Sequence, residues 1–436
     1  MDPLLASLVL ISLALVGARL SFSTDRVPQG PRLIFRTGTH FLFVGFALGP
    51  GGLGLLSSDA THQLFPLLAT GLGWVGFHFG LQLDRESLKH FPLRHHVLGA
   101  GQAVTTFVIF LAAGAGVLAF LGFSDRVSLL LLVSAAAIAA ITTPAGIAMV
   151  SSNFIARGKV RDLLFFVSSL DAGIGIFFLQ VAYALFRPEA MAVGGEAVPQ
   201  ISVVGVALGL GAVLGIVFVW LNRGRARGEE LVLYLLGMCA FSAGAALQLG
   251  LSPLFVSMVM GAVVANMAPD RQRIHRILQR WEKPVYLIFL LLAGALLSFP
   301  TAWVFPLAVL YTVLRGLAKV AATAVLVDLV RLEFPVPRRL GLGLIPQGGI
   351  PLAMAVSGVL MYSDLTVAGV DAETTLFAVI VLGVVMSELA GPFLTGKVLR
   401  RAGELAPGVE AALARGDERR AEREAVKHRA RPREIP

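Results

Sequence analysis

Charged residues and cysteine are both scarce in this chain of 436 residues. Asp, Glu, Lys and Arg make up 14% of it, whereas a water-soluble protein carries roughly 25% to keep its surface solvated. The one cysteine, Cys239, excludes a disulfide framework and any metal site built from cysteines. No nucleophile–base pair and no metal-ligand spacing is visible in the sequence either. We therefore expect no enzymatic activity and no cofactor.

Apolar residues and glycine are abundant instead. Hydrophobic residues make up 56% of the chain, the mean hydropathy is +0.80, and there are 47 glycines. Apolar runs of about 20 residues recur, which is the length that crosses a bilayer as a helix. The net charge of +9 lies in short loops and a tail, a distribution that suits membrane topology better than a nucleic-acid partner. The composition predicts an all-α integral membrane protein embedded in the lipid bilayer.

The apolar runs predict about thirteen membrane spans. Asp2 stands where a cleavable signal peptide would have basic residues, so we expect the first run to be a span. Beyond residue 400 the sequence is dense in Arg, Glu and Ala, which predicts a transmembrane domain over 1–400 and a charged cytoplasmic tail over 401–436. The predicted spans are Leu4–Ala18, Thr39–Leu56, Leu64–Leu83, Val97–Phe120, Ser128–Val150, Leu163–Leu185, Ile201–Leu221, Leu231–Leu249, Leu254–Met267, Val285–Ser298, Val304–Val327, Leu340–Met361 and Thr375–Leu399.

Basic residues alternate between the two ends of the predicted spans. Loops after even-numbered spans hold only Arg126 and Arg187. Because cytoplasmic loops carry the excess of Lys and Arg, we expect the N-terminus outside and the C-terminus in the cytoplasm, with the protein in the cell's inner (plasma) membrane. The basic residues after odd-numbered spans are Arg19, Arg26, Arg32, Arg36, Arg85, Lys89, Arg94, Arg157, Lys159, Arg161, Arg223, Arg225, Arg227, Arg271, Arg273, Arg276, Arg280, Lys283, Arg331, Arg338 and Arg339.

Two spans place proline and glycine near mid-membrane. Span five reads ITTPAGIAM, with Pro144 and Gly146, and span twelve reads PQGGIPLAM. Proline removes a backbone donor and glycine tolerates unwound backbone, so we expect both helices to break there. Seven crossings separate them, so they run in opposite directions, as in secondary transporters built from inverted repeats. Two kinked structural helices are the alternative. The break residues of span twelve are Pro346, Gly348, Gly349 and Pro351.

Charged residues near the middle of two further spans are a strong functional signal. Asp171 lies in span six and Lys319 in span eleven. A charge at the bilayer centre costs roughly 2.5–3.5 kcal/mol, so each must be paired or face water. Ion transport is the usual reason for such residues, and a static buried ion pair is the alternative. Arg315 lies one helical turn before Lys319 on the same face, so one of these two like charges should turn toward another partner or toward water. Glu388 in span thirteen is a possible partner for Arg315.

Seven stretches, in this order, resemble the monovalent cation:proton antiporters of the Kef and Nap sodium/proton type. They are FVGFALGPGGLGLL, GWVGFHFGLQLD, ITTPAGIAM, SLDAGIG, RGLAKVAA, PQGGIPLAMAV and SELAGP, and the likeness covers Pro3 to Arg401. The resemblance implies a homodimer whose protomer has a six-helix core around two crossed, discontinuous helices, here spans five and twelve. We expect the core helices around 64–185 and 304–399, with the remaining helices forming the dimer and scaffold part.

The resemblance also assigns roles to individual residues. The family's cation- and proton-binding aspartate matches Asp171, and its membrane lysine matches Lys319 as the charge partner. The family's threonine-containing break matches Thr142, Thr143 and Pro144. The hydroxyls of the two threonines and the carbonyls freed at the breaks would be the polar ligands. The residues expected to support the site are Ser168, Arg315, Gln347 and Glu388.

Two places depart from the family's pattern. The family usually has a second polar or acidic residue beside the aspartate, where this chain has Leu170 and Ala172, and often a Glu after the glycines of span twelve, where it has Ile350. We expect Na⁺ or K⁺ to be exchanged for H⁺ by alternating access, with the cation and the proton competing for Asp171. Two alternatives remain: a channel-like K⁺ efflux protein with a separate regulatory subunit, and a transport-inactive membrane sensor or assembly protein.

Overall fold

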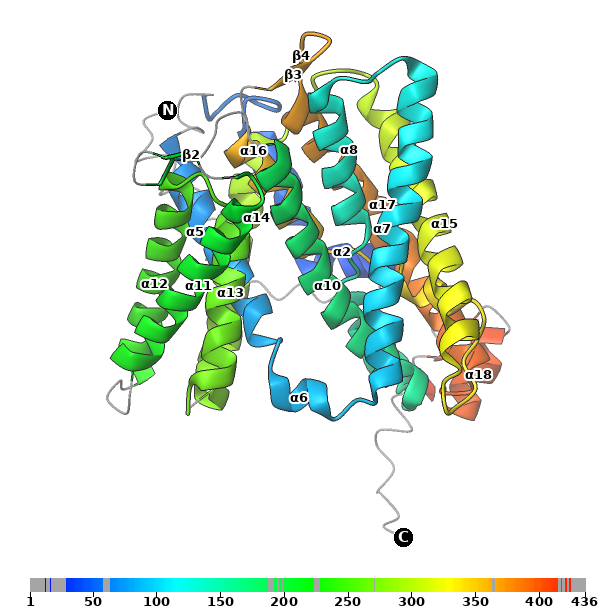
Figure 1. Cartoon of the computed structure of the whole chain (residues 1–436). Helices are drawn as coiled ribbons and strands as arrows, with labels where there is room; N and C mark the ends of the chain where they lie inside the picture. The colour runs from blue at the N-terminus through cyan, green and yellow to red at the C-terminus, as the bar shows by residue number, and fades with distance from the viewer. Residues whose placement is uncertain are drawn as a thin grey trace.

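A bundle of long helices dominates the structure (Figure 1). The computed structural model describes residues 29–57, 63–186, 192–193, 196–197, 199–222, 228–269, 271–362 and 365–414, with residues 12, 16, 417, 420, 421, 423 and 424. Its helices are α2 (Gln29–Thr37), α3 (His40–Leu48), α5 (Phe65–Leu81), α6 (Arg85–Lys89), α7 (Leu93–Leu121), α8 (Arg126–Ala139), α9 (Pro144–Phe154), α10 (Lys159–Phe186), α11 (Ser202–Leu221), α12 (Gly228–Gln248), α13 (Pro253–Met267), α14 (Arg271–Leu296), α15 (Val304–Val330), the 3₁₀ helix η1 (Leu340–Leu344), α16 (Gly349–Met361), α17 (Ala372–Arg401) and α18 (Pro407–Ala414).

The prediction of an all-α membrane protein is confirmed. Six helical stretches in the described residues are long and apolar enough to cross a membrane: α7, α8 with α9, α10, α11, α12 and α17. Shorter apolar helices, α5, α13 and α16, accompany them. Two small antiparallel hairpins interrupt the helices, β1 (Ala192–Val193) with β2 (Glu196–Ala197) and β3 (Thr366–Val367) with β4 (Val370–Asp371). The first predicted span, Leu4–Ala18, lies almost wholly outside the described residues.

The second predicted span, Thr39–Leu56, begins as predicted, since α3 starts at His40 with Thr39 as its N-cap, but its C-terminal limit is wrong. Helix α3 ends at Leu48, because Gly49 and Pro50 stop it and the chain folds back until the Leu56 N–H donates to the Leu48 carbonyl at 2.9 Å. Helix α2 precedes it, in a segment that sequence reasoning assigned to a loop because of its arginines. The span is therefore a pair of short helices with an interruption between them.

The predicted basic loop before Val285 is also helical. Helix α14 begins at Arg271, and its first half is amphipathic, with Ile274 and Leu278 buried at 3% and 0% exposure. Basic side chains on the opposite face lowered the apolar content of this stretch, and the run-based limits missed it for that reason.

Glycines set how closely neighbouring helices approach. A Cβ atom added at Gly80 would collide with the Met258 carbonyl oxygen, and one added at Gly261 would collide with the Phe77 carbonyl oxygen. Helices α5 and α13 therefore touch backbone to backbone, which is the packing that small residues permit in membranes. Helices α11 and α12 pack against this pair, while α7 packs against α8, α10 and α15 (Figure 1).

Helices α8 and α16, which lie at the centre of the bundle, can be followed by the edge at which each begins or ends. Helix α8 begins at the edge of the bundle at which the β3–β4 hairpin lies, whereas α16 ends at that same edge (Figure 1). The two broken helices therefore run in opposite directions.

At the other edge of the bundle, the Glu404 carboxylate accepts hydrogen bonds from the backbone N–H groups of Val160 at 2.6 Å and Arg161 at 2.8 Å. This contact fixes the first turn of α10 to the segment after α17. Val409 of α18 is fully buried nearby.

Asp125 forms the N-cap of α8 and provides a test of the described fold. Its side chain accepts from the Ser128 N–H at 2.9 Å and the Ser128 hydroxyl at 2.7 Å, and these bonds lower the pKa of Asp125. We expect Asp125→Ala to lower the free energy of unfolding by about 1 kcal/mol. The ionised Asp125 carboxylate contributes its full stabilisation at pH values above the ordinary pKa of an aspartate. This contribution is lost as the pH falls through the lowered pKa that Asp125 has in the folded protein.

The measurement is thermal unfolding of the detergent-solubilised protein at neutral pH. Asp125→Asn is the matched control, because an asparagine still caps a helix and should leave the midpoint nearly unchanged. Equal midpoints for Asp125→Ala and the unchanged protein would contradict the assigned cap.

Candidate ion-binding site

Both predicted helix breaks are present. Helix α8 ends at Ala139 and α9 begins at Pro144, and Thr143 between them has the extended dihedrals φ −101° and ψ 129°. In the second break, η1 ends at Leu344 and α16 begins at Gly349. Proline at the first position of α9 suits a helix start, since its missing N–H would have no partner there. Both breaks are buried inside the bundle, which is where unwound backbone is tolerated in a membrane protein.

The two breaks touch each other. The Thr143 N–H donates to the Pro346 carbonyl at 3.0 Å. A Cβ atom added at Gly146 would lie 2.5 Å from the Pro346 Cβ, and one added at Gly348 would lie 3.1 Å from the Thr143 Cγ2. Glycine at these positions therefore lets the two chains cross in contact. Pro351 is buried in the first turn of α16.

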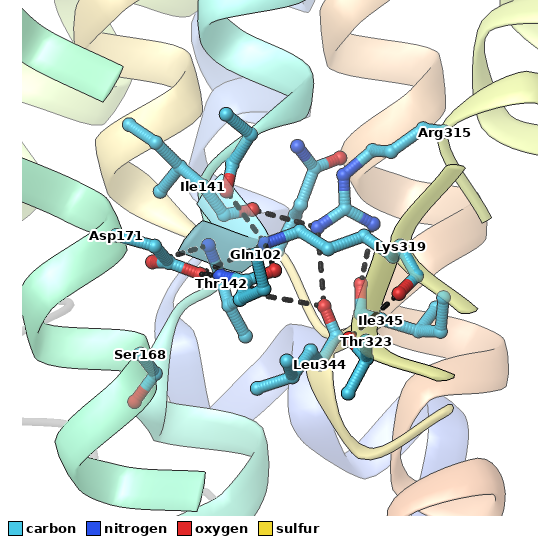
Figure 2. A network of polar contacts seen from close by, with 12 residues as sticks. Gln102, Ile141, Thr142, Ser168, Asp171, Arg315, Lys319, Thr323, Leu344 and Ile345 are labelled. Carbon is cyan, nitrogen blue, oxygen red and sulfur yellow. Dashed lines mark hydrogen bonds and ion pairs between the residues drawn. The ribbon is translucent and has the colours of Figure 1, made fainter. Parts of the chain in front are cut away.

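Asp171 lies midway along α10 and is fully buried. Its Oδ2 atom accepts from the Lys319 ammonium at 2.8 Å and from the Gln102 amide at 3.0 Å, and its Oδ1 atom accepts from the Thr142 N–H at 3.0 Å (Figure 2). Lys319 is fully buried as well. Each charge thus has the opposite charge beside it, which such a pair needs to be stable away from water.

The Lys319 ammonium has a nearly complete shell of oxygen atoms. Besides Asp171, its Nζ atom donates to the Ala140 carbonyl at 2.5 Å and the Thr142 hydroxyl at 2.9 Å, and lies 3.4 Å from the Gln102 amide oxygen. The Thr142 hydroxyl in turn donates to the Leu344 carbonyl at 3.0 Å. The lysine therefore pairs with Asp171 and also neutralises the carbonyl end of α8.

Arg315 bridges the two breaks instead of pairing with Glu388. Its guanidinium donates to the Ile141 carbonyl at 2.7 Å and the Ile345 carbonyl at 2.9 Å (Figure 2). The described ion pairs include none between Arg315 and Glu388, so that pairing is wrong. The physical reason is that each break frees carbonyl groups with no partner in their own helix, and the planar guanidinium reaches both sets.

The remaining predicted residues lie around this centre. Ser168 donates to the Phe165 carbonyl of its own helix at 2.9 Å and points away from Asp171 (Figure 2). Gln347 donates to the Tyr311 hydroxyl at 3.0 Å. Gln102, in contrast, contacts both charged groups and was missed by sequence reasoning. A lone amide in the apolar run of α7 was the available signal.

A cavity of about 430 Å³ reaches the first break from a different direction. It is bordered by α2, α5, α9, α14 and α16, and Asp171 is not among the residues that line it. Its inner wall includes Thr143, whose buried hydroxyl has no hydrogen-bond partner in the described part of the chain, and Tyr286, for which the same holds. Charged side chains, including Glu282 and Lys283, also line it.

The contact at Gly146 yields a second prediction. Gly146→Ala should lower the free energy of unfolding by roughly 1–3 kcal/mol, because the added methyl group overpacks the crossing against Pro346. Gly116→Ala in α7 is the matched control, since a Cβ atom there meets nothing within 4 Å. Thermal unfolding in detergent compares the two variants. If Gly146→Ala unfolds at the same temperature as Gly116→Ala, the breaks do not cross in contact.

Comparisons with known proteins agree with this architecture. The solved structure of the sodium proton antiporter MjNhaP1 from Methanocaldococcus jannaschii at pH 8 is 18% identical to this chain, with a TM-score of 0.66 over 91% of this chain and 99% of that one. An electron-microscopy structure of the same antiporter is 19% identical, with a TM-score of 0.63 over 93% and 100%. At identities this low, the structural likeness shows a shared fold alone.

The family comparison covers nearly the whole bundle. No curated protein sequence matches the chain. Residues 11–401, however, match the family described as "Sodium/hydrogen exchanger, transmembrane". This match includes both breaks, Asp171 and Lys319. The protein therefore belongs to the sodium/hydrogen exchanger family.

Proposed function

We propose that this protein exchanges a small monovalent cation, Na⁺ or K⁺, for H⁺ across the inner membrane, with the cation and the proton competing for Asp171. Family membership supports cation/proton exchange, and the family description supports Na⁺ as the first cation to test. The competition, the site residues and the transport cycle are our inference from the geometry below.

One observation carries the proposal: the oxygen shell around the Lys319 ammonium. A carboxylate, a hydroxyl, a backbone carbonyl and an amide oxygen all lie within 3.4 Å of Nζ. These hard oxygen ligands suit a small metal cation as well as an ammonium group. A Na⁺ ion of the same charge could replace the ammonium once Lys319 withdraws, with Asp171 and Thr142 as its ligands.

Proton binding at Asp171 follows from the same charges. When Lys319 withdraws without a cation in its place, Asp171 becomes an uncompensated buried charge, which is strongly unfavourable. Binding a proton or binding a cation each removes that cost, and the two exclude each other at one carboxylate. Competition of this kind couples the two fluxes without a second site.

Access to Asp171 must alternate, because the residue is fully buried in this conformation. Helices α7 to α10 and α15 to α17 share contacts around the breaks. Helix α5, which lies in the range that we expected for the core, packs chiefly against α13 and α12 instead. We propose that these two groups rock against each other, as in other transporters with broken helices. Exposed apolar side chains on α11 and α12, such as Trp220 and Leu233, would face lipid or a second copy in a homodimer.

A transport-inactive sensor is the second candidate. Every oxygen of Asp171 is already hydrogen-bonded to a protein group, and Leu170 and Ile350 stand where the family often has polar side chains. A locked ion pair of this type could be purely structural. Flux measurement decides between the two candidates, and K⁺ movement without coupled proton movement would instead favour the channel-like alternative.

Asp171→Asn tests the shared carboxylate. In proteoliposomes holding a pH-sensitive dye, Na⁺- or K⁺-driven proton movement should fall to the level of protein-free liposomes, because an amide takes up no proton at neutral pH and has no negative charge to balance a buried cation. Asp162→Asn on the same helix is the control, since Asp162 is half exposed and pairs with Arg161 at the surface. It should retain the flux. Full retention by Asp171→Asn would refute the competition scheme.

A further inference from the structure

A third interruption in the bundle lies between α2 and α3. Gly38 has φ +84°, a left-handed conformation that glycine adopts readily. It turns the chain so that two threonine hydroxyls meet, with Thr37 Oγ1 and Thr39 Oγ1 2.9 Å apart. The Thr39 hydroxyl is also 3.2 Å from Glu388 Oε1 of α17 and donates to it. This brings a carboxyl group to the end of a short chain of hydroxyls.

Glu388 differs from Asp171 in having no cationic partner among the residues that the structure describes. Its side chain is fully buried, and its Oε2 atom has no hydrogen-bond partner in the described part of the chain. A carboxylate in such a place would be a desolvated, unpaired charge, which proteins avoid. A carboxyl group that carries a proton fits the same surroundings, because it is neutral.

The charges on neighbouring elements are already engaged. Arg315 donates to the freed carbonyls and Lys319 pairs with Asp171. The Arg36 guanidinium of α2 donates to the Ser152 hydroxyl at 3.4 Å, and Tyr286 of α14 is an uncharged phenol whose hydroxyl has no hydrogen-bond partner in the described part of the chain. Ionisable side chains on the elements around Glu388 include Arg32, Arg36, Tyr286, Tyr311, Arg315 and Lys319, and no described ion pair joins any of them to Glu388.

The hydroxyl chain begins at the cavity. Thr37 lines the same 430 Å³ space as Thr143 and Tyr286, while Glu388 does not. We propose that Glu388 is a second proton-binding site of the transport cycle, loaded from this cavity through Thr37 and Thr39. The proposal rests on the exchange function proposed above, and it adds one proton per cycle at a carboxyl group separate from Asp171.

The relay needs no other chemical group. A proton from cavity water binds Thr37 Oγ1, the Thr37 hydroxyl hydrogen passes to Thr39 Oγ1, and the Thr39 hydroxyl hydrogen passes to the Glu388 carboxylate. Each threonine ends with the one hydrogen it began with, and only the carboxylate is protonated. In this conformation the Thr37 hydroxyl donates to the Leu33 carbonyl at 2.9 Å, so one hydroxyl rotation opens the path.

Glu388 is mechanically connected to the crossing. The neighbouring Ser387 hydroxyl donates to Gln347 Oε1 at 3.4 Å in the second break. One turn further along α17, a Cβ atom added at Gly391 would lie 2.8 Å from the Pro346 Cγ. A shift of the breaks during transport therefore moves the surroundings of Glu388, which allows its proton to be bound in one conformation and released in another.

The charge balance of transport provides the test. Exchange of one cation for one proton at Asp171 moves no net charge, whereas a further proton at Glu388 moves one charge per cycle. In proteoliposomes, holding the membrane potential at zero should accelerate Na⁺-driven proton movement by the unchanged protein at least several-fold. Glu388→Gln should remove this acceleration while retaining exchange. Glu373→Gln, in the same helix with an equally buried carboxyl group, is the matched control and should keep the acceleration.

Infrared spectroscopy reads the proton independently of transport. The carbonyl band of a protonated carboxyl group should be lost in Glu388→Gln and retained in Asp171→Asn. When the protein is transferred to heavy water, this carbonyl band shifts as deuterium replaces the proton. The shift should be at least tenfold slower in Thr39→Val, which keeps the side-chain shape and removes the hydroxyl. Thr39 makes no side-chain cap to α3, so this change does not remove a helix cap.

The outcomes separate this proposal from the exchange function. Persistence of the potential effect in Glu388→Gln, or an unchanged protein that is indifferent to potential, would overturn the second transported proton. If no cation drives proton movement in the unchanged protein, the exchange function and the transported proton fail together. The infrared band then decides whether Glu388 binds a proton at all, and its absence would remove the site itself.

Discussion

The fold depends on how the two helix breaks are kept electrically and sterically stable inside a membrane. Each break leaves carbonyl groups without partners, in surroundings where no bulk water can satisfy them. Helix α15 resolves this with two cations one turn apart: Lys319 serves the carbonyl end of α8, and Arg315 serves both breaks. The repulsion between these like charges is tolerated because each faces a different set of oxygens.

This arrangement makes the ion pair part of the scaffold. Lys319 cannot leave Asp171 without also giving up the Ala140 carbonyl and the Thr142 hydroxyl. In the proposed exchange, a cation that enters would therefore replace several hydrogen bonds of the ammonium at once, whereas a proton on Asp171 would only neutralise the carboxylate. The two ligands would then stabilise different conformations of the breaks, which is the condition for a ligand to shift a conformational equilibrium.

Sequence reasoning found the parts of this site that leave a strong local signal. Proline with glycine located both breaks, and charge at mid-span located Asp171 and Lys319. It failed where the signal was weak or ambiguous: Gln102 is one amide in an apolar run, and the partner of Arg315 is a set of backbone carbonyls that have no sequence signature. The α2–α3 interruption was missed because arginines made α2 look like a loop. The role of Gln102, the partners of Arg315 and the structure of α2 all depend on contacts between segments that are far apart in the sequence.

In the proposed cycle, the α2–α3 interruption would give the site a second, chemically different half. On one side of the crossing, an acid is held charged by a fixed cation. On the other side, Glu388 is buried with hydroxyl groups and without a described cationic partner. This chain lacks a polar residue beside Asp171, where Leu170 stands. A second acid placed on α17 can supply proton binding without a like charge next to Asp171, and it avoids the repulsion that two adjacent carboxylates would suffer.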